Sequence, residues 1–308
     1  MTNRVTLPPG ITVLERGWLS SNNILLLGPT HGALVDSGYG AHAAQTCALV
    51  ASALQGCTLD ALLNTHLHSD HCGGNAALQQ AYPALQTLIP PGLAAHVRQW
   101  DPHALTYAPT GQHCPPFRCD ALLQPGTELQ LGDRPWQVHA APGHDTHSVI
   151  LFQPDTRVLL SADALWERGF GVVFPELEGE DAFAAVGDTL DRLESLAPVT
   201  VIPGHGPTFS DVAAALANAR ARLDSFVTQP EKHLNYAVKV LLKFKLLEAQ
   251  HLAFSDFVAW AHATPYFHLI QRTHFPTLDF TPWVDGLIAD LVRSGAAVRE
   301  GEMIGNAG

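Results

Sequence analysis

The feature that most constrains this chain of 308 residues is a short segment in which four metal-binding side chains follow an apolar strand. Ala61–Asn64 is expected to be that strand, and the residues after it read Thr-His-Leu-His-Ser-Asp-His-Cys-Gly-Gly-Asn. His66 and His68 lie two positions apart on an extended chain, so their side chains point the same way. The tight turn that follows brings Asp70 and His71 back near them. Imidazole with carboxylate is the ligand set of a zinc-type catalytic site rather than of a calcium site.

Three further candidate ligands stand in turns that leave predicted strands. They are His144 after the strand at 136–140, Asp163 after the strand at 157–161, and His205 after the strand at 199–202. Each of these signals is weak alone, because Pro-Gly turns and aspartates at strand ends are common. Together with the first segment they supply five histidines and two aspartates, which is enough for two adjacent metal ions.

The order of the expected elements indicates layered sheets flanked by helices, an α/β (α+β layered) class. Short apolar runs broken by Gly and Pro predict strands up to about residue 205. Helices are expected at 41–55, 74–81, 92–100 and 180–196, with irregular stretches at 101–118 and 164–179. Farther on, helices are expected at 211–227, at 231–250 and from Pro282 to Gly295, with a short hairpin at 297–304. No other strand is expected after residue 205.

These motifs resemble those of the metallo-β-lactamase-fold hydrolases over about residues 10–210. The segment Leu34-Val-Asp36-Ser-Gly38 matches an early strand-turn motif of that superfamily. The resemblance implies an αββα sandwich with the metal site along one edge. It implies a catalytic domain over residues 1–210 and a helical C-terminal module over 211–308, for which a winged helix is one form.

The resemblance also implies a role for each candidate ligand. His66, His68 and His144 would hold a first metal; Asp70, His71 and His205 a second; Asp163 would bridge both, and Asp36 would support the site from behind. The implied cofactors are two divalent ions, zinc first, with iron or manganese as alternatives.

Within the superfamily, residues 65–75 are most similar to the Thr-His-x-His-x-Asp-His-x-Gly-Gly-Asn pattern of the glyoxalase II branch of thioester hydrolases. Asp163-Ala-Leu-Trp leads to Gly169-Phe-Gly171, which also matches that branch. The chain departs from the branch at three places. Val172 replaces an Arg, and His144-Asp-Thr-His147 lacks the usual Gly-His ending of the third motif. Gly206-Pro replaces a Glu-Tyr ending, in which the Tyr marks the glutathione-binding side.

The function implied is hydrolysis of an ester, thioester or lactone by a dinuclear centre through a metal-bound hydroxide. Asp70 would be the catalytic residue that orients the nucleophile. Two enzymatic alternatives stay open, an iron-dependent sulfur oxygenase of the same fold and a β-lactamase. A binding or regulatory module built on the C-terminal helices is a third.

The irregular stretch after Asp163 offers aromatic side chains for substrate binding. We expect Trp166, Phe170 and Phe174 to line the pocket, with packing beneath a loop as the alternative for each. Because this stretch has no Lys or Arg between Arg168 and Arg192, a neutral or weakly charged acyl group is the expected substrate.

Composition narrows the partners. With 17 Lys and Arg against 29 Asp and Glu, the formal charge of −12 disfavours nucleic acid. No stretch of 18 apolar residues predicts a membrane span, and the first residues do not resemble a secretory signal. An odd count of five cysteines suggests reduced thiols, so we expect a cytoplasmic protein. The expected partners are a small-molecule substrate and, as an open alternative to a monomer, a second copy in a homodimer.

Overall fold

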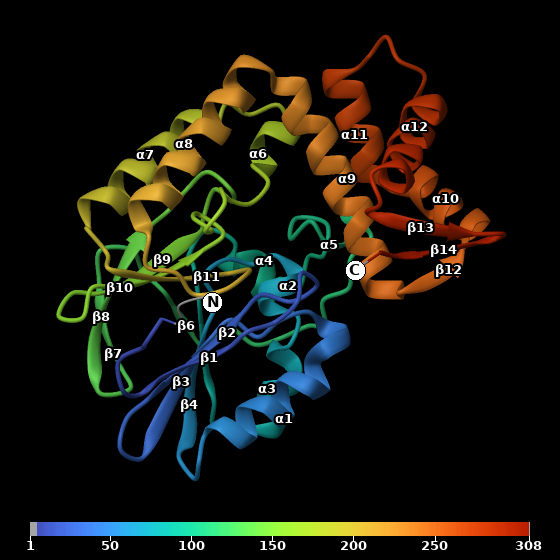
Figure 1. Ribbon diagram of the computed structural model, residues 1–308. Helices are drawn as coiled ribbons and strands as arrows, with labels where there is room; N and C mark the ends of the chain where they lie inside the picture. Colours follow the sequence, from blue (N-terminus) through green and yellow to red (C-terminus); the bar gives the residue numbers. More distant parts are fainter. Residues whose placement is uncertain (1–4, 308) are drawn as a thin grey trace.

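Two β-sheets lie face to face in the computed structural model, which describes residues 5–307 (Figure 1). The first sheet has the order β1-β2-β3-β4-β5-β6. Its strands are β1 (Ile11–Leu14), β2 (Asn23–Leu27), β3 (His31–Val35), β4 (Thr58–Leu63), β5 (Gln86–Ile89) and β6 (Ala121–Leu122). The second sheet has the order β11-β10-β9-β8-β7. Its strands are β7 (Glu128–Leu131), β8 (Arg134–Ala140), β9 (Val149–Gln153), β10 (Val158–Ala162) and β11 (Thr200–Pro203).

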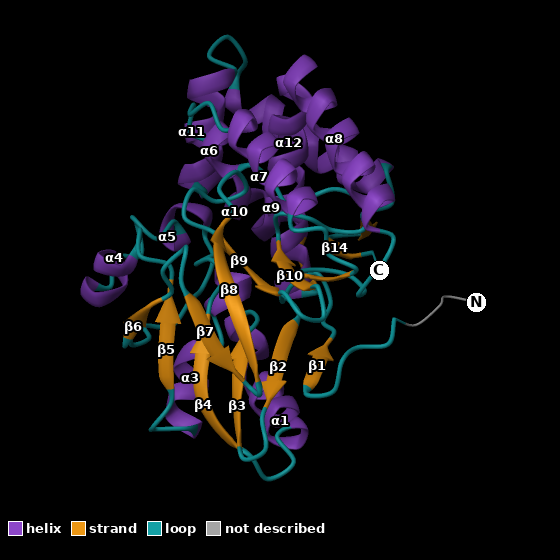
Figure 2. Ribbon diagram, turned by 90° about the vertical axis from the view of Figure 1, so that its left-hand side faces the viewer, coloured by secondary structure: helices purple, strands orange, loops and turns teal. Residues whose placement is uncertain are grey.

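Helices cover the outer faces of the sheets and one end of the molecule. The helices up to residue 195 are the 3-10 helix η1 (Gly40–His42), α1 (Ala43–Ala53), α2 (Ser69–Cys72), α3 (Asn75–Ala81), α4 (Ala94–Gln99), α5 (Tyr107–Thr110), α6 (Phe174–Leu177) and α7 (Phe183–Ser195). Those that follow β11 are α8 (Val212–Thr228), α9 (Pro230–Ala249), α10 (Phe254–Ala263), α11 (Pro265–His274) and α12 (Phe280–Arg293). The helices after β11 gather at the top of the view in Figure 2, above the ends of the strands.

Alternation along the strands builds the layers. On β2, Leu25 packs outward against α1, while its neighbours Ile24 and Leu26 face the second sheet. On β10, Leu159 packs outward beneath α7 and α8, while Val158 and Leu160 face inward. Because successive side chains on a strand point to opposite faces, each strand feeds two apolar cores. This confirms the predicted αββα layering.

The C-terminal part holds more structure than the sequence indicated. The expectation of no strand beyond the hairpin was wrong, because β12 (His251–Ala253) pairs with β14 (Met303–Asn306), which also pairs with β13 (Ala297–Glu300). Helices α10 and α11 were not anticipated either. The expected hairpin is β13–β14. The division at residue 210 and the winged-helix form stay predictions.

Helix α9 is tied to the first sheet's side of the molecule near its C-terminal end. The hydroxyl of Tyr39 donates to Glu248 Oε1 at 2.7 Å and accepts from the backbone N–H of His113 at 3.1 Å. Tyr39 is 1 % exposed, and its ring packs edge-on against Phe244 of α9. One buried hydroxyl therefore joins η1, the 101–118 stretch and α9.

Tyr39→Phe tests this connection. We expect the free energy of unfolding to fall by about 2 kcal/mol, because an amide and a carboxylate both lose a buried partner. Urea denaturation measures the change. Tyr82→Phe is the matched control, since no described residue bonds the Tyr82 hydroxyl, and it should stay within about 0.5 kcal/mol of wild type. Equal effects of the two substitutions would contradict the role of the Tyr39 hydroxyl.

Candidate metal centre and cavity

All seven predicted ligands lie just beyond the C-terminal ends of four strands. The segment of residues 65–72 follows β4, His144 follows β8, Asp163 follows β10 and His205 follows β11. Strands β8, β10 and β11 run in the same direction, so their ends reach the same edge of the second sheet. The two sheets bring this edge against the end of β4, which is how residues far apart in the sequence meet.

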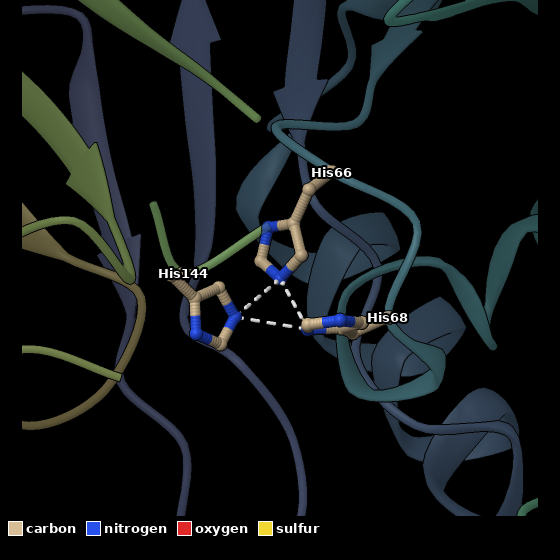
Figure 3. Close-up of side chains that lie close together, drawn as sticks. All are labelled: His66, His68 and His144. Atoms are coloured by element: carbon tan, nitrogen blue, oxygen red, sulfur yellow. Dashed lines mark hydrogen bonds between the residues drawn. The ribbon is translucent and has the colours of Figure 1, made fainter. Parts of the chain in front are cut away.

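Three histidines form the first cluster (Figure 3). His66 Nε2 lies 3.0 Å from His68 Nδ1 and 3.2 Å from His144 Nε2, and the latter two atoms are 2.9 Å apart. A ring nitrogen carries either a proton or a lone pair, so three mutual contacts cannot all be hydrogen bonds. Zn–N bonds of about 2.0–2.1 Å in a tetrahedral set place nitrogens about 3.3 Å apart. The triangle therefore fits a divalent metal ion.

Asp70, His71 and His205 form the second cluster, and their ligand atoms lie within 4.8 Å of one another. His205 Nε2 is 3.1 Å from Asp70 Oδ2. The buried His71 Nε2 has no hydrogen-bond partner among the described residues, and it faces Asp70 Oδ2 at 3.9 Å. A buried ring nitrogen that has no hydrogen-bond partner and faces a carboxylate is suited to bind a metal ion.

Asp163 lies between the two clusters. Its Oδ1 is 3.5 Å from His71 Nε2, and its Oδ2 is 3.4 Å from His144 Nε2 and 3.9 Å from His205 Nε2. One carboxylate thus faces a histidine of each cluster. Gly204 leaves room for it, because a Cβ at that position would overlap Asp163 Oδ1.

The electrostatics of the two clusters differ. Burial and the neighbouring His144 lower the pKa of His68 to about 4, and burial with His71 lowers the pKa of His66 well below its usual range. These two rings are therefore neutral and offer lone pairs. Burial also lowers the pKa of His71, but the carboxylates of Asp163 and Asp36 outweigh it and raise the pKa well above its usual value.

The Nδ1 atoms of His71 and His144, which face away from the clusters, are held by hydrogen-bond partners. Asp36 Oδ2 lies 2.8 Å from His71 Nδ1, and its Oδ1 accepts from the backbone N–H of Thr65 at 2.9 Å. The backbone carbonyl of Val172 accepts from His144 Nδ1 at 2.5 Å, which leaves Nε2 free to face the first cluster. Such partners fix the tautomer and orientation of a histidine that binds metal.

A cavity opens beside the two clusters. Trp166 and Phe174 line it as predicted, and the indole N–H of Trp166 donates to Asp163 Oδ1 at 3.2 Å. Phe170 does not line it, so that prediction is corrected. The turn at Gly169 sends Phe170 into the core beneath α8, where it is 1 % exposed and packs against Phe226.

Part of the cavity wall was missed from the sequence. Trp18 is 58 % exposed and stacks on the His205 ring, with centroids 5.4 Å apart and planes 11° apart. Helix α9 contributes Tyr236, Val240, Leu241 and Phe244, and the 101–118 stretch contributes Thr106, Thr110 and Gln112. The sequence around a tryptophan in a loop does not indicate which side chain it will contact. The α9 residues have the helical spacing of side chains that face an apolar core, so the sequence does not distinguish a core from a cavity.

Comparison with known proteins agrees with this geometry. A family model described as the metallo-beta-lactamase superfamily matches residues 16–205. The chain therefore belongs to the metallo-β-lactamase superfamily, and its relatives place it in the glyoxalase II-like branch.

Two of these relatives carry the name hydroxyacylglutathione hydrolase, the enzyme also called glyoxalase II. The protein of Xanthomonas axonopodis pv. citri (strain 306) is 35% identical over 169 residues, which cover 54% of this chain and 55% of the relative. The protein of Nostoc sp. (strain PCC 7120) is 30% identical over 232 residues, which cover 72% of this chain and 77% of the relative. The chain thus spans about half the length of the first of these relatives, and more of the second.

A solved structure extends the similarity of fold to the C-terminal helices. The beta-lactamase domain protein from Burkholderia ambifaria superposes with a TM-score of 0.60 at 22% identity, covering 97% of this chain and 93% of that one. At this identity the likeness concerns the fold alone.

Gly171→Ala tests how closely the backbone packs on the ligands. A Cβ at this position would clash with His144 Nδ1 and lie 2.8 Å from His144 Cε1. We expect at least a tenfold loss of zinc affinity, as when a group that orients a metal ligand is disturbed. Competition with a chromophoric chelator measures it.

The matched control is Gly187→Ala on α7, where the added Cβ meets only Leu223 Cδ2 at 3.8 Å. Zinc affinity should not change there, and stability should rise by about 0.5–1 kcal/mol because alanine favours the helix. Wild-type zinc affinity in Gly171→Ala would contradict the close approach.

Proposed function

We propose that the protein is a dinuclear metal-dependent hydrolase of an ester, thioester or lactone. The observation that carries this proposal is the convergence of five histidines and two aspartates in two clusters joined by Asp163. The names of the curated relatives support hydrolysis of a thioester as the reaction class. Zinc is the proposed metal, with iron and manganese to be distinguished by experiment.

The proposed ligand sets follow from the donors and their contacts. His66, His68 and His144 would hold the first ion, Asp70, His71 and His205 the second, and Asp163 would contact both. Bound together, two such ions supply Lewis acidity at a carbonyl oxygen and activation of water near neutral pH. The remaining roles belong to the side chains of the chain itself.

Asp70 is the proposed catalytic carboxylate. Its side chain is 16% exposed and lines the cavity, whereas those of His71, Asp163 and His205 are at most 5% exposed. Its Oδ2 lies 3.1 Å from His205 Nε2, and this contact holds the carboxylate in place. The carboxylate is therefore placed to accept a hydrogen bond from an attacking water and to orient it toward the substrate.

The cavity favours a substrate with a neutral acyl group. No lysine or arginine lines it among the described residues, while Trp18, Trp166, Phe174, Tyr236 and Phe244 all do. In the described part of the cavity wall, no lysine or arginine is therefore placed to pair with a glutathione carboxylate, and the overall charge of −12 disfavours polyanionic substrates at long range. Apolar and aromatic contacts are proposed to supply most of the binding.

The cytoplasmic location and the homodimer stay predictions of the sequence. Among the described residues, no helix combines the length and apolar character needed to cross a membrane.

Metal content is the first test of the proposal. We expect wild type to bind two zinc ions per chain, and His205→Ala to lose mainly the second, because the other cluster keeps its three histidines. Mass spectrometry of the protein, after loading and gel filtration, gives the count. His139→Ala is the control, since that partly buried histidine lies on β8 away from the cavity. A wild type that never exceeds one equivalent would overturn the dinuclear assignment.

Substrate preference is the second test. We expect aliphatic or aromatic esters, thioesters and lactones to be hydrolysed better than S-lactoylglutathione. Trp166→Ala should raise KM by up to about thirtyfold, because about 2 kcal/mol of apolar contact is lost, and kcat should change less. Trp166→Phe keeps most of the ring and should stay within about threefold.

Steady-state kinetics on a substrate panel, with oxygen uptake measured in parallel, distinguishes hydrolysis of a neutral acyl substrate from hydrolysis of a glutathione thioester and from oxygenation. Preference for the glutathione thioester by tenfold or more would refute the neutral pocket. Oxygen consumption with one bound iron would refute hydrolysis itself.

A further inference from the structure

The segment of residues 171–174 holds two of the proposed ligands through its backbone. The N–H of Gly171 donates to the carbonyl of Asp163 at 2.9 Å, and the N–H of Phe174 donates to the carbonyl of His144 at 3.1 Å. Between them, the carbonyl of Val172 accepts from the His144 ring. The orientation of His144 therefore depends on where this segment is fixed.

Another backbone donor of the segment points to the C-terminal part of the chain. The N–H of Val173 donates to His233 Nε2 at 3.0 Å, and His233 is a fully buried residue of α9. The Val172 carbonyl and the Val173 N–H belong to one peptide group, which is planar. A bond that fixes the N–H therefore also fixes the carbonyl, which lies in the same plane and points in the opposite direction.

The protonation of His233 suits this role and carries a cost. Because its Nε2 accepts, its proton lies on Nδ1, which is buried without a partner among the described residues. Phe183 and Phe226 pack around the ring instead. Burial, aided by the charge of Arg222, lowers the pKa of His233 to about 4, so the ring is neutral and able to accept. An apolar side chain would avoid the unpaired donor, so the acceptor needs an explanation beyond packing.

We propose that His233 is a positioning residue for the first metal, acting through the 172–173 peptide group to aim the His144 ring. The inference rests on the proposed ligand set. Helix α9 then influences the metal centre although none of the proposed ligands lies on that helix. A chain of two hydrogen bonds through one peptide also strengthens each of them, because each polarises the next.

The test compares substitutions at position 233 in the His205→Ala background, where only the first ligand set is complete. His233→Leu keeps the bulk and removes the acceptor, and we expect the zinc dissociation constant to rise about tenfold, the lower end for a group behind a ligand. His233→Gln extends an amide oxygen to about the reach of Nε2 and should recover most of the affinity. His233→Asn has the same amide one atom short and should behave like His233→Leu.

Phe226→Leu is the control for packing, because it disturbs the cluster around the His233 ring and leaves the bond to Val173 in place. It should lower the melting temperature without changing zinc affinity. Zinc dissociation constants from chelator competition, with melting curves of the same samples, give both readouts. Loss of affinity in His233→Leu and His233→Asn, with recovery in His233→Gln, is the expected result.

Other outcomes separate this inference from the proposed function. Wild-type zinc affinity in His233→Leu, or an equal loss in Phe226→Leu, would overturn the positioning role alone. If the chain without substitution bound no zinc, the proposed function and this inference would both fall.

Discussion

Three carboxylates around one imidazole, two of them buried and one partly exposed, determine how this edge of the molecule must be built. Asp36, Asp70 and Asp163 all face His71, whose side chain has no exposure. Uncompensated buried charges cost several kcal/mol each, so the loops that carry them stay together only around positive charge. The carboxylates raise the pKa of His71, so a proton on its ring offsets part of this charge, and a divalent cation bound at His71 would take the place of that proton. Folding of this edge and cation binding are therefore coupled.

The residues of the two clusters could be picked out from the sequence because their signals are local. His66, His68, Asp70 and His71 fall within six residues, and the other three candidates each follow a strand whose apolar run is readable. Short apolar runs also suffice to predict strands in layered sheets flanked by helices. What brings the four strand ends together is the pairing of distant strands, and for that the resemblance to a known superfamily was needed.

The wall of the cavity was predicted less well, for reasons that are physical. Phe170 and Trp166 are both aromatic residues of one short irregular stretch, and only the turn at Gly169 decides that one enters the core and the other the cavity. The aromatic residues of α9 have the same spacing whether they face a core or a cavity. Helices α10 and α11 were missed because Pro265 interrupts the run, although as the first residue of α11 it is well tolerated. Strand β12 has three residues and is defined only by its pairing with β14.

Helix α9 is fixed near both ends, through His233 to the 172–173 peptide and through Glu248 to Tyr39. The fifteen residues between these points correspond to about 22 Å of helix. A helix held near both ends is a fixed wall of the cavity and not a hinged lid. Any movement of α9 away from the cavity would have to break the bond to the 172–173 peptide or the bond to Tyr39. The shape of this side of the cavity is therefore set when the chain folds, before any ligand arrives.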